Sequence, residues 1–129
     1  MKKSTNIIYW LPRILCILSI LFISLFALDA FQSELTLTQQ IVAFLIHLIP
    51  SFILIATLII AWKWEFIGGI MFTLIGIGFS PSIFMHNYKM NQSIWITTGI
   101  ISSITLPFVI IGILFIISHY QKKNIYIKV

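Results

Sequence analysis

Four long apolar segments, separated by short polar stretches, organise this chain. They cover about residues 11–30, 40–62, 66–85 and 95–118. A helix needs roughly 20 mainly apolar residues to cross a hydrocarbon core of about 30 Å. Each segment reaches this length, so the sequence predicts four membrane-spanning helices within one domain, 1–129.

Small and polar residues recur on one face of each predicted helix. Burying leucine against leucine gains little in lipid, so membrane helices associate through such faces. The pattern therefore predicts an all-α, antiparallel four-helix bundle. At 100° per residue, the faces contain Arg13, Ile20, Ser24 and Ala27 in the first span, Ala43, His47, Pro50, Ser51 and Ala61 in the second, Glu65, Gly69, Thr73, Gly76, Ser80 and Asn87 in the third, and Asn91, Thr98, Ser102, Thr105, Gly112 and His119 in the fourth.

Two features fix where the helices begin and meet. Thr36 and Gln39 have the spacing of a capping box, which predicts the start of the second helix. The stretch 63–65 is very short, so the second and third spans are expected to be antiparallel neighbours. The tails, 1–6 and 121–129, are polar or basic and are expected to be unstructured.

Composition agrees with a lipid environment. The chain is 60% hydrophobic and 9% charged, with a mean hydropathy of +1.08, whereas roughly a quarter of soluble sequence is charged. The net charge of +5 lies at segment ends and forms no contiguous basic face, which argues against nucleic-acid binding. The abundance of Ile, Lys and Asn favours a bacterial source.

The basic residues also predict orientation, because cytoplasmic loops carry the excess of Lys and Arg. One side of the bundle would hold seven of these residues and the other side would hold one. The sequence thus predicts a multi-pass protein of the cytoplasmic membrane with both termini cytoplasmic. The seven are Lys2, Lys3, Arg13, Lys63, Lys122, Lys123 and Lys128, and the eighth is Lys89.

A cleaved signal peptide is the alternative interpretation of the first span. Lys2, Lys3 and Arg13 would form its basic region and Ala30 its cleavage residue. The apolar run is longer than most such regions, and Asp29 interrupts the small-residue site. A retained helix is therefore favoured.

Three polar residues are expected at similar depth near the cytoplasmic ends of their helices: Arg13, Glu65 and His119. A carboxylate in a dry bundle needs a partner, and arginine can offer two hydrogen bonds. We expect an inner clasp that ties the first, third and fourth helices. The favoured role is structural, and a functional role stays open.

The opposite end collects a second polar set, comprising Asp29, Glu34, His47, His86 and Asn87. His47 should lie about 9 Å below the outer boundary on the packing face. A buried, ionisable histidine within a membrane is a functional candidate. The alternative is a neutral imidazole that donates to a carbonyl freed by Pro50, or to a serine.

Outside these two groups of polar residues, the sequence shows no pattern typical of a catalytic or metal-binding site. His47 and His86 have no Cys, Met or carboxylate at ligand spacing, so no metal or haem site and no cofactor is predicted. No serine has a positioned acid and base, so no catalytic residue is assigned. The single cysteine, Cys16, excludes an internal disulfide.

Two stretches resemble an uncharacterised family of short bacterial four-span membrane proteins. They read RILCILSILFISLFALDAF (13–31) and HLIPSFILIATLIIAWKWEFIGGI (47–70). The resemblance covers the first three spans and implies a four-helix bundle and a domain of unknown function. It supplies no activity and no site residues.

Several functions remain open at this level. The favoured one is a non-enzymatic accessory or structural membrane protein that acts as a homo-oligomer or with a partner membrane protein. The alternative is a small oligomeric transporter or ion or proton pathway using His47 or Glu65. Small multidrug transporters have similar length, but they need a carboxylate deep in the first helix, and none lies between Arg13 and Asp29. A membrane enzyme or redox subunit using His47 and a bacteriocin immunity protein are further possibilities.

Overall fold

A computed structural model describes the backbone of residues 2–127 and the side chains of residues 6–125 and 127. Within this part the chain forms four α-helices, one 3-10 helix and no strand. They are α1 (Lys2–Leu25), η1 (Phe26–Ala30), α2 (Leu37–Lys63), α3 (Glu65–Asn91) and α4 (Ile94–Ile127). Each α-helix, α1 being extended by η1, is long and apolar enough to cross a membrane. The predicted all-α, four-helix, multi-pass architecture is confirmed.

The helix ends differ from the predicted spans because the helices continue past their apolar segments. The Thr36–Gln39 capping box is present and starts α2, which confirms that prediction. The last helix, α4, has 34 residues, which corresponds to a length of about 51 Å. The expectation of unstructured tails is wrong for the described residues, since the start of α1 and the end of α4 are helical. These ends support each other: Lys122 Nζ lies 4.1 Å from the centre of the Tyr9 ring.

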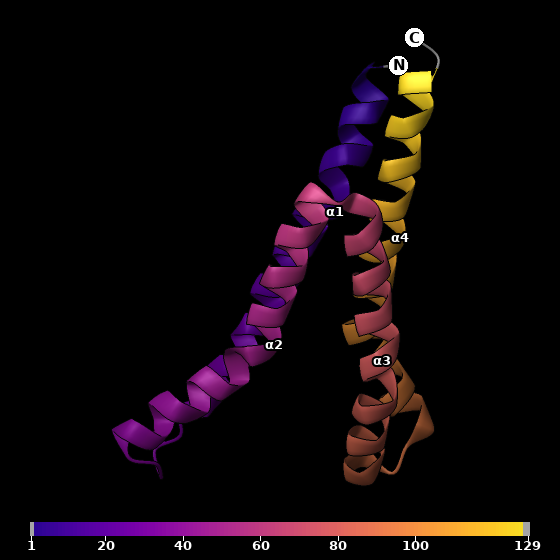
Figure 1. Cartoon of the computed structure of the whole chain (residues 1–129). Coiled ribbons are helices and arrows are strands. Elements are labelled where there is room, and N and C mark those ends of the chain that lie inside the picture. Colours follow the sequence, from indigo (N-terminus) through magenta and orange to yellow (C-terminus); the bar gives the residue numbers. More distant parts are fainter. Residues whose placement is uncertain (1, 128–129) are drawn as a thin grey trace.

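The four helices form two arms that meet at one end (Figure 1). The first arm is α1, η1 and α2, and the second arm is α3 and α4. Both arms meet at the end that carries the start of α1 and the finish of α4, which we call the terminal end. They diverge toward the open end, where the 31–36 and 92–93 connections lie. One residue, Trp64, links α2 to α3, so these helices are the antiparallel neighbours predicted, but chiefly near the terminal end.

The backbones of α3 and α4 pack closely against each other in the second arm. A Cβ atom built on Gly69 would lie 2.7 Å from the Gly112 carbonyl oxygen, and one on Gly76 would lie 3.0 Å from that of Thr105. Only glycine permits such approach. The Phe72 and Phe115 rings stack at 5.9 Å between centroids. The small-residue face predicted for the third span therefore packs against α4.

The apolar core lies where the arms join. Its members come from all four α-helices: Cys16, Ile20, Leu54, Leu58, Ala61, Phe72, Phe108, Ile111 and Phe115. Within the first arm, Ser24 Oγ donates to Ser51 Oγ at 2.9 Å. The buried positions of α2 begin only at Ser51. Toward the open end the apolar side chains of α2 are consequently exposed rather than packed against the second arm.

Candidate polar site at the terminal end

The centre of the site is Glu65, which is held by its position in the chain. It is the first residue of α3 and follows the single linking residue Trp64. A carboxylate at a helix N-terminus interacts favourably with the helix dipole. The linker and the helix start thus place one acid at the junction of the two arms, where it is only 6% exposed.

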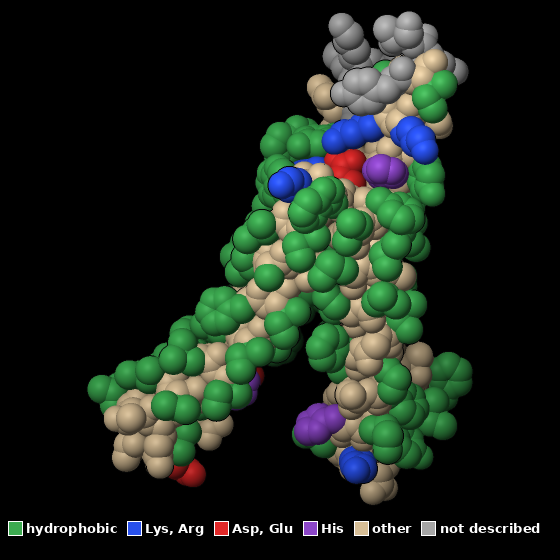
Figure 2. Space-filling view, viewed as in Figure 1, with side chains coloured by type: hydrophobic (Ala, Val, Ile, Leu, Met, Phe, Trp, Pro, Cys, Tyr) green, Lys and Arg blue, Asp and Glu red, His purple; other side chains and the backbone are tan. Residues whose placement is uncertain are grey.

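Three side chains donate to the Glu65 carboxylate. Arg13 Nη2 from α1 and Lys122 Nζ from α4 each lie 2.7 Å from Oε1. Ser118 Oγ from α4 donates to Oε2 at 3.3 Å. Arg13 is fully buried, whereas Lys122 is 39% exposed. These four residues, named here the Glu65 cluster, join α1, α3 and α4, and Figure 2 shows the charged side chains gathered at this end.

Aromatic groups enclose the buried guanidinium. Arg13 Cζ lies 3.6 Å from the centre of the Tyr9 ring and 5.4 Å from those of Trp62 and Phe115. Its Nη1 also donates to the Tyr9 carbonyl, while Nε has no partner among the described residues. Cation–π contact compensates part of the lost hydration of a buried cation. Through Trp62, α2 completes the enclosure, so all four helices contact or surround Arg13.

The sequence predicted half of this cluster. The expected Arg13–Glu65 pair is present, although its functional role stays a prediction. His119 is not among the side chains that donate to Glu65; the centre of its ring lies 5.6 Å from that of Phe66. Lys122 and Ser118 were missed as partners. They lie four residues apart and so share a face of α4, but the sequence predicts that the fourth span ends at 118, before Lys122.

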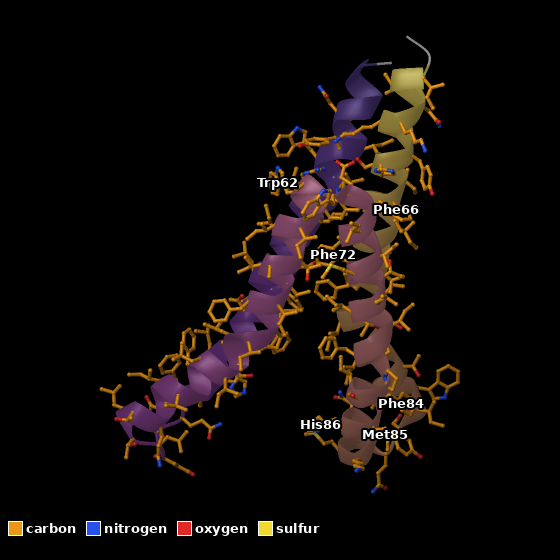
Figure 3. The ribbon with its side chains drawn as sticks, in the orientation of Figure 1. Trp62, Phe66, Phe72, Phe84, Met85 and His86 are labelled. Carbon is orange, nitrogen blue, oxygen red and sulfur yellow. The ribbon has the colours of Figure 1, made fainter. Side chains whose placement is uncertain are left out.

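A pocket of about 410 Å³ lies beside Glu65 at the same end. Its lining combines aromatic side chains with basic and titratable ones: Trp62, Lys63, Trp64, Glu65, Phe66, Ile67, His119 and Lys122. Lys63 Nζ lies 4.8 Å from the centre of the Trp64 ring. Figure 3 shows Trp62 and Phe66 on neighbouring helices close to the link between the arms. The acid of the cluster therefore borders a partly polar space.

The prediction that His47 is buried on a packing face is wrong. Its side chain is exposed, and Nδ1 donates to the Ala43 carbonyl at 2.7 Å within the same helix. The alternative prediction of a bond to the carbonyl freed by Pro50 is not met either, because that carbonyl belongs to Ile46. His47 does share a helical face with buried Ser51, but it lies one turn before Ser51, where the buried positions of α2 begin.

The other residues expected at this end are divided between the arms. Asp29 in η1 and Glu34 in the following loop belong to the first arm, and both are exposed. His86 lies on α3, on the side that faces the first arm (Figure 3). Asn87 Nδ2 donates to the Ile83 carbonyl at 2.9 Å. Among the described residues no three His, Cys, Asp or Glu side chains are grouped so as to hold a metal ion.

Comparison with known proteins places the chain in a family without assigning it a function. No curated protein and no solved structure matches it. A family model described as "Domain of unknown function (DUF7670)" matches residues 1–126. The match extends through the fourth helix, beyond the stretches that carried the resemblance in the sequence. The chain, with its four helices and its Glu65 cluster, therefore belongs to this uncharacterised family.

Proposed function

We propose that this protein is a non-enzymatic accessory or structural protein of a bacterial cytoplasmic membrane. The observation that supports it best is that Glu65 accepts hydrogen bonds from Arg13, Lys122 and Ser118. An acid whose oxygens already accept three hydrogen bonds is suited to holding helices together. The cluster is then a clasp at the terminal end, and the exposed apolar arms offer surface to a second copy or a partner membrane protein.

Both termini are proposed to be cytoplasmic. The described basic side chains Arg13, Lys63, Lys122 and Lys123 belong to the terminal end, whereas Lys89 lies in the last turn of α3 at the open end. An excess of Lys and Arg favours the cytoplasmic side. Lys2, Lys3 and Lys128, which contribute to the predicted asymmetry, lie outside the described side chains.

An ion or proton pathway through Glu65 is the second candidate. The pocket of about 410 Å³ supports it, because it brings open space next to a carboxylate inside a membrane protein. Membrane-embedded acids often mark such pathways. His47 does not support this candidate, since its side chain is exposed and bonded to its own helix.

Flux through reconstituted vesicles separates the two candidates. Purified protein is placed in liposomes that contain a pH-sensitive dye, and proton entry is followed after a pH or voltage step. A structural clasp predicts the same flux as in protein-free liposomes, together with lower thermal stability for Glu65→Gln. Proton flux that Glu65→Gln abolishes and Lys63→Gln preserves would overturn the structural proposal in favour of a pathway.

A further inference from the structure

A second cavity lies between the arms, on the open-end side of the core. It measures about 320 Å³ and receives side chains from α1, η1, α2, α3 and α4. Representative lining residues are Ile53, Leu54, Gly76, Phe79, Thr105 and Phe108. It is separate from the pocket beside Glu65, with which it shares no lining residue. In Figure 2 the space between the arms widens toward the open end.

The cavity lining is suited to a hydrocarbon occupant. Thr105 supplies its one side-chain hydroxyl, and that group already donates to the Ile101 carbonyl at 3.0 Å. A water molecule needs two to four polar partners, so an apolar space of this kind stays dry. An apolar cavity of about 150 Å³ holds one benzene molecule. The present volume is about twice as large and has room for an alkyl segment of about a dozen carbons.

The open end supplies a counterpart for a lipid headgroup. Lys89 and His86 are exposed near the end of α3, and His86 faces the space between the arms (Figure 3). Lys89 forms no ion pair among the described side chains. Ten residues separate Phe79 in the cavity from Lys89, a rise of about 15 Å along the helix. This equals half of a hydrocarbon core of about 30 Å.

We propose that the cavity binds one acyl chain of a phospholipid from the leaflet at the open end, with the lipid phosphate beside Lys89 and His86. The charge of Lys89 complements the phosphate, and the spacing along α3 fits a single leaflet. A second copy of this chain is a poorer occupant. A helix with side chains is about 10 Å wide, too bulky for the narrow space where the arms converge.

Photocrosslinking tests the acyl-chain site. The full chain is reconstituted into phosphatidylethanolamine and phosphatidylglycerol vesicles that contain a phospholipid with a diazirine at one acyl-chain end. After irradiation, mass spectrometry maps the crosslinked residues. We expect crosslinks to concentrate on Phe79 and Phe108, which line the cavity, rather than on Ile77 and Ile110, which lie at comparable depth but do not line it. Equal labelling of the two sets would mean that the lipid is an ordinary neighbour, and would overturn the proposal.

A matched pair of variants tests whether the crosslink to Phe108 requires a lipid chain inside the cavity. Ile53 lines the cavity, whereas Ile55, of similar exposure, does not. Ile53→Trp should fill the cavity and remove the Phe108 crosslink, and Ile55→Trp should leave it unchanged. An unchanged crosslink in a folded Ile53→Trp protein would contradict the site. A second copy as the occupant would instead give disulfide-linked dimers of Phe79→Cys in a Cys16→Ala background, and this too would overturn the proposal.

The headgroup contact has its own measurement. A diazirine-labelled diacylglycerol, which lacks phosphate, should label Phe108 less efficiently than the labelled phospholipid. One lysine near the membrane surface attracts an anionic lipid by about 1 kcal/mol, a factor of roughly five. Lys89→Gln should therefore reduce the preference for the phospholipid about fivefold, while Lys123→Gln at the terminal end should not. A preference that survives Lys89→Gln would refute the proposed placement of the phosphate.

Discussion

Replacing Glu65 by glutamine tests whether the Glu65 cluster holds the helices together. The substitution keeps the shape of the side chain and removes its charge. Arg13 is fully buried and would then lack a carboxylate partner in a water-poor site. Removing one partner of a buried ion pair costs about 3–5 kcal/mol of folding free energy. We expect Glu65→Gln to destabilise the protein by this amount.

The other members of the cluster should contribute differently. Lys122 is 39% exposed, and ion pairs in contact with water contribute only about 0–1 kcal/mol. Lys122→Gln should accordingly cost much less than Glu65→Gln. Arg13→Gln leaves Glu65 with Lys122 and Ser118, which still donate to both of its oxygens. The double variant Arg13→Gln/Glu65→Gln should cost less than the sum of its single changes, because neither charge is then stranded.

Reversible unfolding in mixed micelles with increasing denaturing detergent measures these free energies. Side chains in contact show coupling energies of about 0.5–3 kcal/mol in a double-mutant cycle. Additivity of the Arg13 and Glu65 changes, within about 0.5 kcal/mol, would refute an energetic link between them. A Lys122→Gln cost equal to that of Glu65→Gln would refute the assignment of the buried arginine as the principal partner.

Three further predictions concern packing, the outer histidine and topology. Gly76→Leu should lower the free energy of unfolding by about 1–3 kcal/mol through overpacking. Gly78→Leu should leave it unchanged, because a Cβ atom added there meets nothing within 4 Å. Equal effects of the two changes would show that the α3–α4 contact is misassigned. His47→Ala should change the unfolding free energy by less than about 0.5 kcal/mol, and a larger loss would mean that the imidazole is packed in the membrane. With Cys16 replaced by alanine, a membrane-impermeant maleimide added to intact cells should label Ser33→Cys and Ser93→Cys but not Asn124→Cys. The reverse pattern would invert the proposed orientation.

Hydropathy and residue spacing predicted most of the helical architecture. Length and apolarity define each span, and the Thr36–Gln39 pair marks the start of α2, because both signals are local. The helical faces that carry Gly69 and Gly112 also followed from a period of 3.6 residues, and the structure shows that they contact each other. The sequence did not predict that the arms diverge, because the divergence depends on how far α2 packs against α3 beyond the one-residue link between them. A periodic face looks the same in sequence whether or not a neighbouring helix reaches it.

The same limit explains the uneven prediction of the candidate sites. Arg13 and Glu65 could be paired because each is the exceptional charge within an apolar helix. Lys122 was treated as part of a solvated tail, and only the continuation of α4 brings it to the carboxylate. His47 lies on the expected face of its helix, but the arms have separated at that height. Its depth in the membrane stays a prediction, whereas its predicted burial is wrong.

The uneven placement of charge along the two arms gives the molecule an electrical polarity. At the terminal end four described basic side chains, Arg13, Lys63, Lys122 and Lys123, outweigh Glu65 by three charges. At the open end Asp29 and Glu34 outweigh Lys89 by one. Turning the protein over would therefore be equivalent to moving about four elementary charges across the membrane. At about 2.3 kcal/mol per charge for each 100 mV, a potential of this size would favour one orientation of the inserted protein over the other by about 9 kcal/mol.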